Sequence, residues 1–108
     1  MTPPDAVGQL GAIHTQLGAI CRAAGDFERA LYYFRESIRL EEARGNLYAA
    51  AQARGSVAIT LMQVGRLADA RQYAEAALRG FQAYGAGAAD DVQKTLALIA
   101  AIAKAATA

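Results

Sequence analysis

Cysteine and histidine each occur only once in this 108-residue chain, as Cys21 and His14. A single cysteine cannot form a disulfide within the chain. One cysteine and one histidine cannot complete a zinc site unless carboxylates join them. An unpaired cysteine fits a reducing compartment. We therefore expect neither a disulfide nor a metal site, and we expect a cytoplasmic location.

An excess of charge of either sign is also missing. Lysine and arginine total 11, aspartate and glutamate total 10, and the formal net charge is +1. This balance provides no attraction to a phosphate backbone, so nucleic acid is not an expected partner. The chain start lacks the pattern of a signal peptide, and the apolar stretch 95–108 is broken by Lys104 and too short to span a bilayer. We expect a soluble protein with no membrane association.

The residues that usually build an active site do not occur together. His14 has no serine or cysteine nucleophile at a spacing that suggests a dyad. Asp90 and Asp91 are adjacent and point in different directions, so they do not form an acid and base pair. The glycine-rich segment 80–87 contains no lysine followed by serine or threonine, which excludes a phosphate-binding loop. We therefore expect no enzyme activity and no cofactor.

Proline is confined to positions 3 and 4, so it interrupts no helix interior. Glycine, in contrast, recurs every 20 residues, at positions 25, 45, 65 and 85. Apolar residues at helical spacing fill the intervals, and each glycine is expected to end a helix in a left-handed conformation. Asp26 and Asn46 follow two of these glycines as N-caps. The pattern predicts five helices, over residues 5–23, 26–44, 46–64, 66–84 and 88–106.

Comparing the chain with itself after a shift of 40 residues shows that two hairpins form one repeated unit. Identical residues coincide at glycine, tyrosine, arginine and alanine positions, and similar apolar residues coincide at others. Ala30 and Ala70 are one such pair, and their small side chains are expected where the helices of a hairpin cross. Leucine at either position should cost about 1 to 3 kcal/mol through overpacking.

These repeats resemble the tetratricopeptide family in its longer variant of about 40 residues. The resemblance rests mainly on Leu17-Gly18, on Gly25-Asp26-Phe27 and on Ala30, and it is weaker in the second repeat. It implies an all-α fold in which antiparallel helical hairpins stack as a short right-handed solenoid of five helices. A single domain, 1–108, would contain one repeat at 12–45, a second at 46–85, and a terminal capping helix at 88–106.

Charged residues concentrate on the second and fourth expected helices. In a stack of hairpins, one set of helices lines the concave side and the other covers the convex side. The charged helices suit the solvated convex face, and Glu41 and Glu42 are expected on a solvated helix end.

The resemblance then implies a concave, largely apolar groove lined by the first, third and fifth helices, which would bind a partner helix or peptide. Applying the same offset to the fifth helix adds Thr95, Ile99 and Ile102, together with Val92. The implied partner-binding residues are Thr15, Ala19, Arg22, Gln52, Gly55, Ile59, Met62, Thr95, Ile99 and Ile102.

An exposed apolar row formed by Ile59, Met62, Ile99 and Ile102 would need a cover, because such patches mark interaction sites. A partner protein or peptide is one cover. The alternative is a second copy of this chain, giving a homodimer through the apolar end helices or the groove. The chain is also compatible with a piece of a longer repeat array, or with a regulatory domain of a bacterial signalling protein, the latter on resemblance alone.

Overall fold

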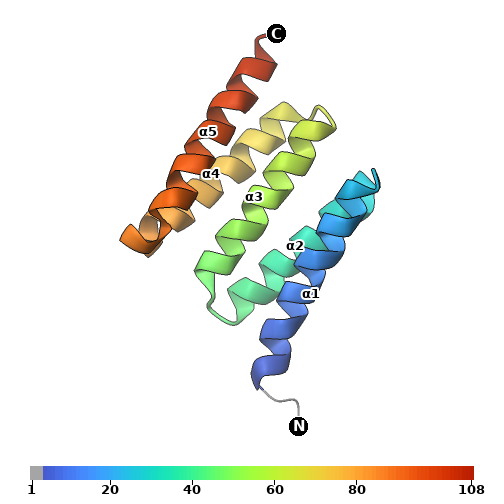
Figure 1. Cartoon of the computed structure of the whole chain (residues 1–108), viewed down its shortest axis with the longest axis vertical. Coiled ribbons are helices and arrows are strands. Elements are labelled where there is room, and N and C mark those ends of the chain that lie inside the picture. The colour runs from blue at the N-terminus through green and yellow to red at the C-terminus, as the bar shows by residue number, and fades with distance from the viewer. Residues whose placement is uncertain (1–3) are drawn as a thin grey trace.

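The protein is all-α, as a computed structural model shows (Figure 1). The structure describes the backbone of residues 4–108 and the side chains of residues 9–108. Each helix packs chiefly against its neighbours in the sequence, and the molecule is a thin slab of 53 × 34 × 17 Å. The helices are α1 (Pro4–Ala23), α2 (Phe27–Ala43), α3 (Leu47–Gln63), α4 (Leu67–Tyr84) and α5 (Ala89–Ala106), with a 3₁₀ turn η1 (Ala86–Ala88) before the last.

The ends of the helices confirm the prediction from the glycine spacing. Glycines 25, 45, 65 and 85 have φ values of 82°, 77°, 82° and 101°. After α1 the amide of Gly25 donates to the carbonyl of Arg22, and the amide of Asp26 donates to the carbonyl of Cys21. This double hydrogen bond ends a helix around a left-handed residue, and it recurs after α2 and α3.

The predicted N-caps are confirmed as well. The Asp26 carboxylate accepts a hydrogen bond of 3.2 Å from the Arg29 amide, and the Asn46 side chain accepts one of 3.0 Å from the Ala49 amide. Helix α4 has no side-chain cap. There the Arg66 guanidinium instead forms a 2.7 Å ion pair with Asp69 in the first turn, where a carboxylate favours the helix dipole.

The core lies where α2, α3, α4 and α5 meet, and small residues allow the helices to approach. Ala30 and Ala70 are fully buried, as predicted for the crossing positions. Phe34 of α2 packs against Gly18 of α1, and a Cβ atom at position 18 would lie 2.7 Å from the ring. The hydrophobic core comprises Ala30, Leu31, Phe34, Ile38, Ala53, Val57, Ala58, Leu61, Ala70, Ala74 and Ile102.

The offset assumed for the fifth helix is wrong by two residues. Helix α3 begins two residues after Gly45, whereas α5 begins four residues after Gly85, because η1 occupies the space between. The correct shift from α3 to α5 is therefore 42 residues. With this shift, four residues of α5 align with the face of α3 that packs against the preceding helix. These residues are Val92, Thr95, Ile99 and Ile102.

The expected exposed row is consequently not exposed. Ile102 is a core residue with 1% of its surface accessible, and Thr95 is also buried. Met62 and Ile99 are partly buried and pack against the same core, and Ile59 is partly buried too. Ile99 and Ile102 hold α5 on the core, and Met62 of α3 packs against the same core, so these three residues are not a free surface.

Candidate functional site

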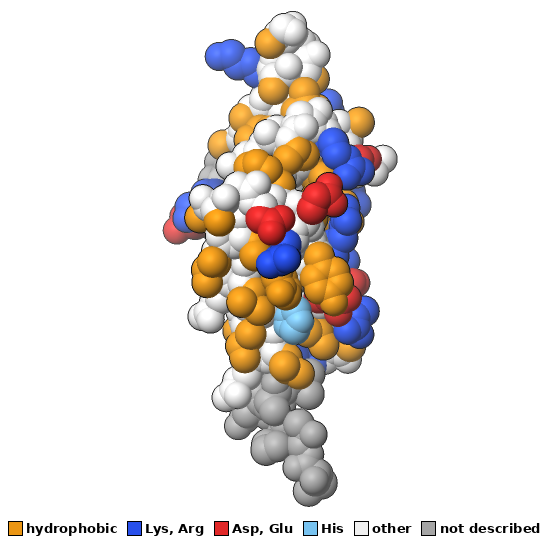
Figure 2. Space-filling view, turned by 90° about the vertical axis from the view of Figure 1, so that its right-hand side faces the viewer, with side chains coloured by type: hydrophobic (Ala, Val, Ile, Leu, Met, Phe, Trp, Pro, Cys, Tyr) orange, Lys and Arg blue, Asp and Glu red, His pale blue; other side chains and the backbone are white. Residues whose placement is uncertain are grey.

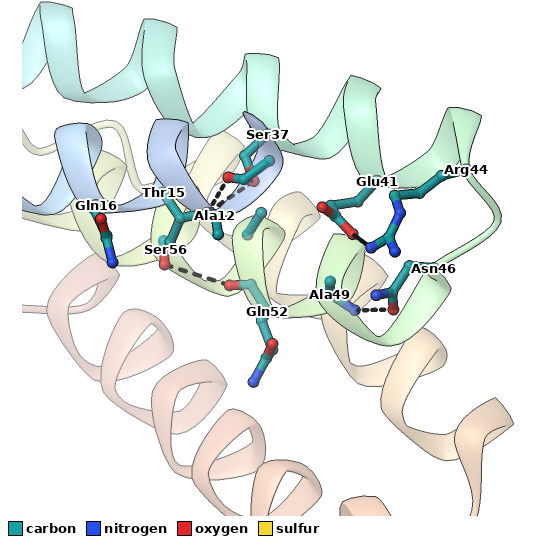
Figure 3. Close-up of a pocket in the computed structure, with 12 residues that line it drawn as sticks. Ala12, Thr15, Gln16, Ser37, Glu41, Arg44, Asn46, Ala49, Gln52 and Ser56 are labelled. Atoms are coloured by element: carbon teal, nitrogen blue, oxygen red, sulfur yellow. Dashed lines mark hydrogen bonds and ion pairs between the residues drawn. The ribbon is translucent and has the colours of Figure 1, made fainter. Parts of the chain in front are cut away.

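A groove of about 530 Å³ lies between α1 and α3 and has α2 as its floor (Figure 3). Helices α1 and α3 are separated in Figure 1, and along their described parts they are not packed against each other over any extended length. The groove is lined by Gly11, Ala12, Thr15, Gln16, Ser37, Glu41, Arg44, Asn46, Ala49, Gln52, Ala53 and Ser56.

Small residues keep this space open. Gly11 and Ala12 contribute the α1 wall, while Ala49 and Ala53 contribute the α3 wall. None of these side chains is longer than a methyl group, so they leave the space between the two helices unfilled. A groove that exists for this reason is part of the packed fold and needs no side chain to move aside.

Two hydroxyl groups join α1 to the floor of the groove. The hydroxyl oxygens of Thr15 and Ser37 lie 2.8 Å apart. Both are also within hydrogen-bond distance of the Gly11 carbonyl, at 3.1 Å and 3.2 Å. Ser37 is 1% exposed, and a buried hydroxyl needs such partners to offset its desolvation. The network fixes the position of α1 above α2 and thus the depth of the groove.

Glu41 lies in the floor, which corrects the expectation that it faces solvent. Only 4% of its surface is accessible. One carboxylate oxygen forms a 3.2 Å ion pair with the Arg44 guanidinium. The other lies against Gly11, and a Cβ atom at that position would overlap the carboxylate. Glu42, its neighbour, is exposed and pairs with Arg54 at 3.0 Å.

Amide side chains stand at the rim of the groove. Gln16 of α1 and Gln52 of α3 are exposed, and both extend away from α2 toward the mouth (Figure 3). Asn46 uses its carbonyl oxygen to cap α3, which leaves its NH₂ group as a donor. Amide groups donate and accept hydrogen bonds at once, so this rim can pair with the backbone of another chain.

A second, smaller hollow of about 250 Å³ lies between α3 and α5. Gln52, Gly55, Ile59 and Thr95 line it. At its α5 side the Tyr48 phenol donates a hydrogen bond of 2.7 Å to the Asp91 carboxylate. This hydrogen bond raises the pKa of Tyr48, because the phenol must remain protonated to donate it.

The sequence-predicted partner residues therefore separate into four groups. Thr15 and Gln52 line the larger groove, and Gln52 also joins Gly55, Ile59 and Thr95 in the smaller one. Ala19 is exposed and belongs to neither. The remaining four point into the packed interior, and they are Arg22, Met62, Ile99 and Ile102.

Arg22 is the least expected member of that last group. Its guanidinium carbon lies 5.8 Å from the centroid of the Phe34 ring. One of its terminal nitrogens is buried and has no hydrogen-bond partner in the described part of the chain. Attraction between the cation and the ring face partly offsets the loss of hydration. Arg22 thus packs over the Phe34 ring.

Sequence reasoning missed the residues of the groove floor, Ser37 and Glu41, and the rim residue Gln16. The floor residues belong to α2, whose charged residues led to its assignment to the convex face. A signal was nevertheless present, since Ser37 is a hydroxyl residue flanked by apolar core positions on the buried side of an amphipathic helix. Buried hydroxyl groups require partners, and Thr15 supplies one.

The fold and the groove define an all-α protein of consecutive helical hairpins with a small cleft between alternate helices. No cluster of metal-binding side chains occurs in the described residues. None of the helices in that part of the chain combines the length and the apolar character that crossing a membrane requires. Neither the protein-family models nor the curated proteins compared with this chain give a match.

Proposed function

We propose that this chain is a tetratricopeptide-like interaction module that binds an extended peptide in the groove between α1 and α3. The observation that carries the proposal is the combination of a preformed, unfilled groove with amide groups along its rim. Helical repeats of this kind commonly present surfaces to partners rather than carry out chemistry. The 40-residue internal repeat and its buried alanines at the crossing positions support the family assignment.

The size of the groove favours an extended peptide over a helix. A helix with its side chains is about 10 to 12 Å across, so a volume of about 530 Å³ accommodates roughly one helical turn. A single turn makes few contacts. An extended segment is thinner, and it can continue along the groove and present backbone groups to both walls.

The chemistry of the rim agrees with this choice. An extended peptide has unpaired N–H and C=O groups, and each needs a partner when it is removed from water. Gln16 and Gln52 can donate to and accept from such groups on opposite sides of the groove. Glu41 and Arg44 neutralise each other at one end, so the groove selects neither a strongly acidic nor a strongly basic peptide.

Selection from a phage library of random peptides would test the proposal directly. Ala12 is exposed and lines the groove, so Ala12→Arg should obstruct it without disturbing the core. Selected peptides should bind the wild-type protein and lose about tenfold or more in affinity, or about 1.4 kcal/mol, on Ala12→Arg and on Gln52→Ala.

The matched control is Ala68→Arg, which adds the same side chain at an exposed position of α4 outside the groove. Affinity for the selected peptides should be unchanged in this variant. The proposal is wrong if the peptides bind Ala12→Arg as tightly as the wild type, or if all of them protect residues outside the groove in amide exchange.

A further inference from the structure

Four large aliphatic side chains form an uncovered stripe along α1. They recur at intervals of three, four and three residues, which places them on one side of the helix. Figure 2 views this end of the molecule and shows apolar side chains gathered around the single histidine. The stripe consists of Leu10, Ile13, Leu17 and Ile20, which are 43%, 46%, 37% and 65% exposed.

The internal repeat shows that the corresponding face of α3 is buried. Forty residues later, the same positions in α3 are occupied by Ala50, Ala53, Val57 and Thr60. All four are buried, with 0% to 2% of their surface exposed. They lie on α3, which follows α2 in the chain and packs against it. In α1 the residues are larger and no helix of the described chain covers them, so this helix-packing face is unoccupied.

We propose that a second copy of this chain covers the stripe, with the two α1 helices packed antiparallel about a two-fold axis. The axis would pass between Ile13 and Leu17. Leu10 would then face Ile20 of the partner subunit, and Ile13 would face Leu17 of the partner subunit. Each leucine meets an isoleucine, so the stripe is complementary to itself, as an isologous contact requires.

The charge pattern favours a second copy over a foreign helix. Between Gln9 and Cys21 there is no aspartate, glutamate, lysine or arginine, so two identical faces meet without like charges. Selective binding of a different partner usually relies on charges at the contact. The stripe itself has none, and the charged side chains visible on this side of the molecule lie beside it (Figure 2). In the antiparallel arrangement the two helix dipoles also point in opposite directions, which is the favourable orientation.

Neighbouring aromatic residues extend the proposed contact. The His14 ring lies 5.9 Å from the Tyr33 ring on α2, and Tyr32 packs edge-on against Tyr33 at 5.4 Å. Even so, the stripe runs for only about 15 Å along the helix, which is small beside the roughly 800 Å² per partner of a standard interface. The dimer should therefore be weak and sensitive to concentration.

The other end of the molecule is a poorer candidate for this contact. Leu96 is the one large apolar residue with an exposed side chain in the described α5. The rest of the open face of α5 consists mainly of alanines, which bury little area. A pairing through α5 would therefore contribute much less apolar burial than a pairing through α1.

Sedimentation equilibrium from micromolar to millimolar concentration tests the proposal. The wild-type protein should change from monomer to dimer across this range, and the double variant Ile13→Lys with Ile20→Lys should stay monomeric. The matched control, Leu96→Lys with Leu47→Lys, alters two leucines that are 43% and 62% exposed elsewhere, and it should dimerise like the wild type. Ile20→Lys alone is the milder variant, for use if the double variant does not fold.

Cysteine pairing tests the orientation of the helices. In a Cys21→Ser background, Ile13→Cys and Leu17→Cys are made as separate single variants. A mixture of the two should form disulfide-linked dimers at least several-fold faster than either variant alone. A wild type that stays monomeric at millimolar concentration overturns the proposal, and so does a dimer that survives the α1 changes. Faster pairing of each variant with itself overturns the antiparallel arrangement.

Discussion

The phenol of Tyr48 on α3 donates a 2.7 Å hydrogen bond to the carboxylate of Asp91 on α5, and it joins residues 43 positions apart. Tyr48 also packs edge-on against Phe81 of α4, with the ring centroids 5.6 Å apart. One residue thus links α3 to both α4 and α5, at the point where the last helix leaves the 3₁₀ turn.

Tyr48→Phe should loosen the start of α5 while leaving the rest of the fold in place. The variant keeps the ring and its packing but removes the donor, so Asp91 has no partner on α3. Amide exchange in the first turns of α5 should become faster, with little change in α1 and α2. Tyr32→Phe is the control, because Tyr32 is exposed and distant from α5. Equal exchange in wild type and Tyr48→Phe would show that the hydrogen bond does not hold α5.

The same hydrogen bond predicts a pH dependence. The pKa of Tyr48 is raised in the folded protein, so its stabilising effect is complete below the unfolded tyrosine pKa of about 10. The effect is lost as the pH rises through the higher folded pKa. A tyrosinate absorbance titration of the wild type minus Tyr48→Phe should show Tyr48 ionising above pH 10. Asp91→Asn should move that midpoint downward, and an unmoved midpoint would contradict the assigned cause.

Gly18→Ala should destabilise the protein, whereas Gly55→Ala should stabilise it. A methyl group at position 18 would lie 2.7 Å from the ring of the buried Phe34, whereas one at position 55 would have no heavy atom within 4 Å. Replacing a helical glycine by alanine gains up to about 1 kcal/mol in helix propensity. In Gly18→Ala, overpacking costs about 1 to 3 kcal/mol and exceeds this gain. Gly55→Ala receives the gain without the cost. Urea unfolding measures both, and the same sign of change in the two variants would contradict this packing.

The contact between Gly11 and Glu41 can be tested with a double-mutant cycle. Gly11→Ala should displace the Glu41 carboxylate and cost about 1 to 3 kcal/mol of unfolding free energy. In a Glu41→Ala background, space is available and the same change should cost less, giving a coupling energy of about 0.5 to 3 kcal/mol. Additive effects in urea unfolding would mean that the carboxylate does not occupy the floor of the groove.

The helix boundaries could be predicted from the sequence because the signals that end and begin helices are local. Gly25, Gly45 and Gly65 adopt positive φ angles through their own lack of a side chain. Asp26 and Asn46 each cap the amide three residues ahead. The small residues at the crossing positions, Ala30 and Ala70, follow equally from the repeat. None of these features depends on a distant part of the chain.

The candidate site could be predicted only in part. Thr15 and Gln52 were identified, but Glu41 was expected on a solvated helix end and Ser37 was not assigned to the groove. A helical pattern reports amphipathicity and not which neighbour lies beside each face. The position of α5 depends on a short turn, η1, whose two extra residues redirect Thr95 and Ile102 into the core. A shift of two residues rotates a helix face by about 200°. The small difference in loop length therefore turned the α5 residues that were expected in the groove toward the core.

The helical character of the chain, the ends of its helices and the small residues that let them approach can all be deduced from the sequence, because each follows from the conformational preferences of residues close in the chain. Which helix faces are covered depends instead on the tertiary packing. The apolar positions of α1 and α3 share the same repeat spacing, yet those of α3 are buried against α2, whereas Leu10, Ile13, Leu17 and Ile20 are exposed. Burial depends on the presence of a neighbouring helix, and no residue carries that information alone.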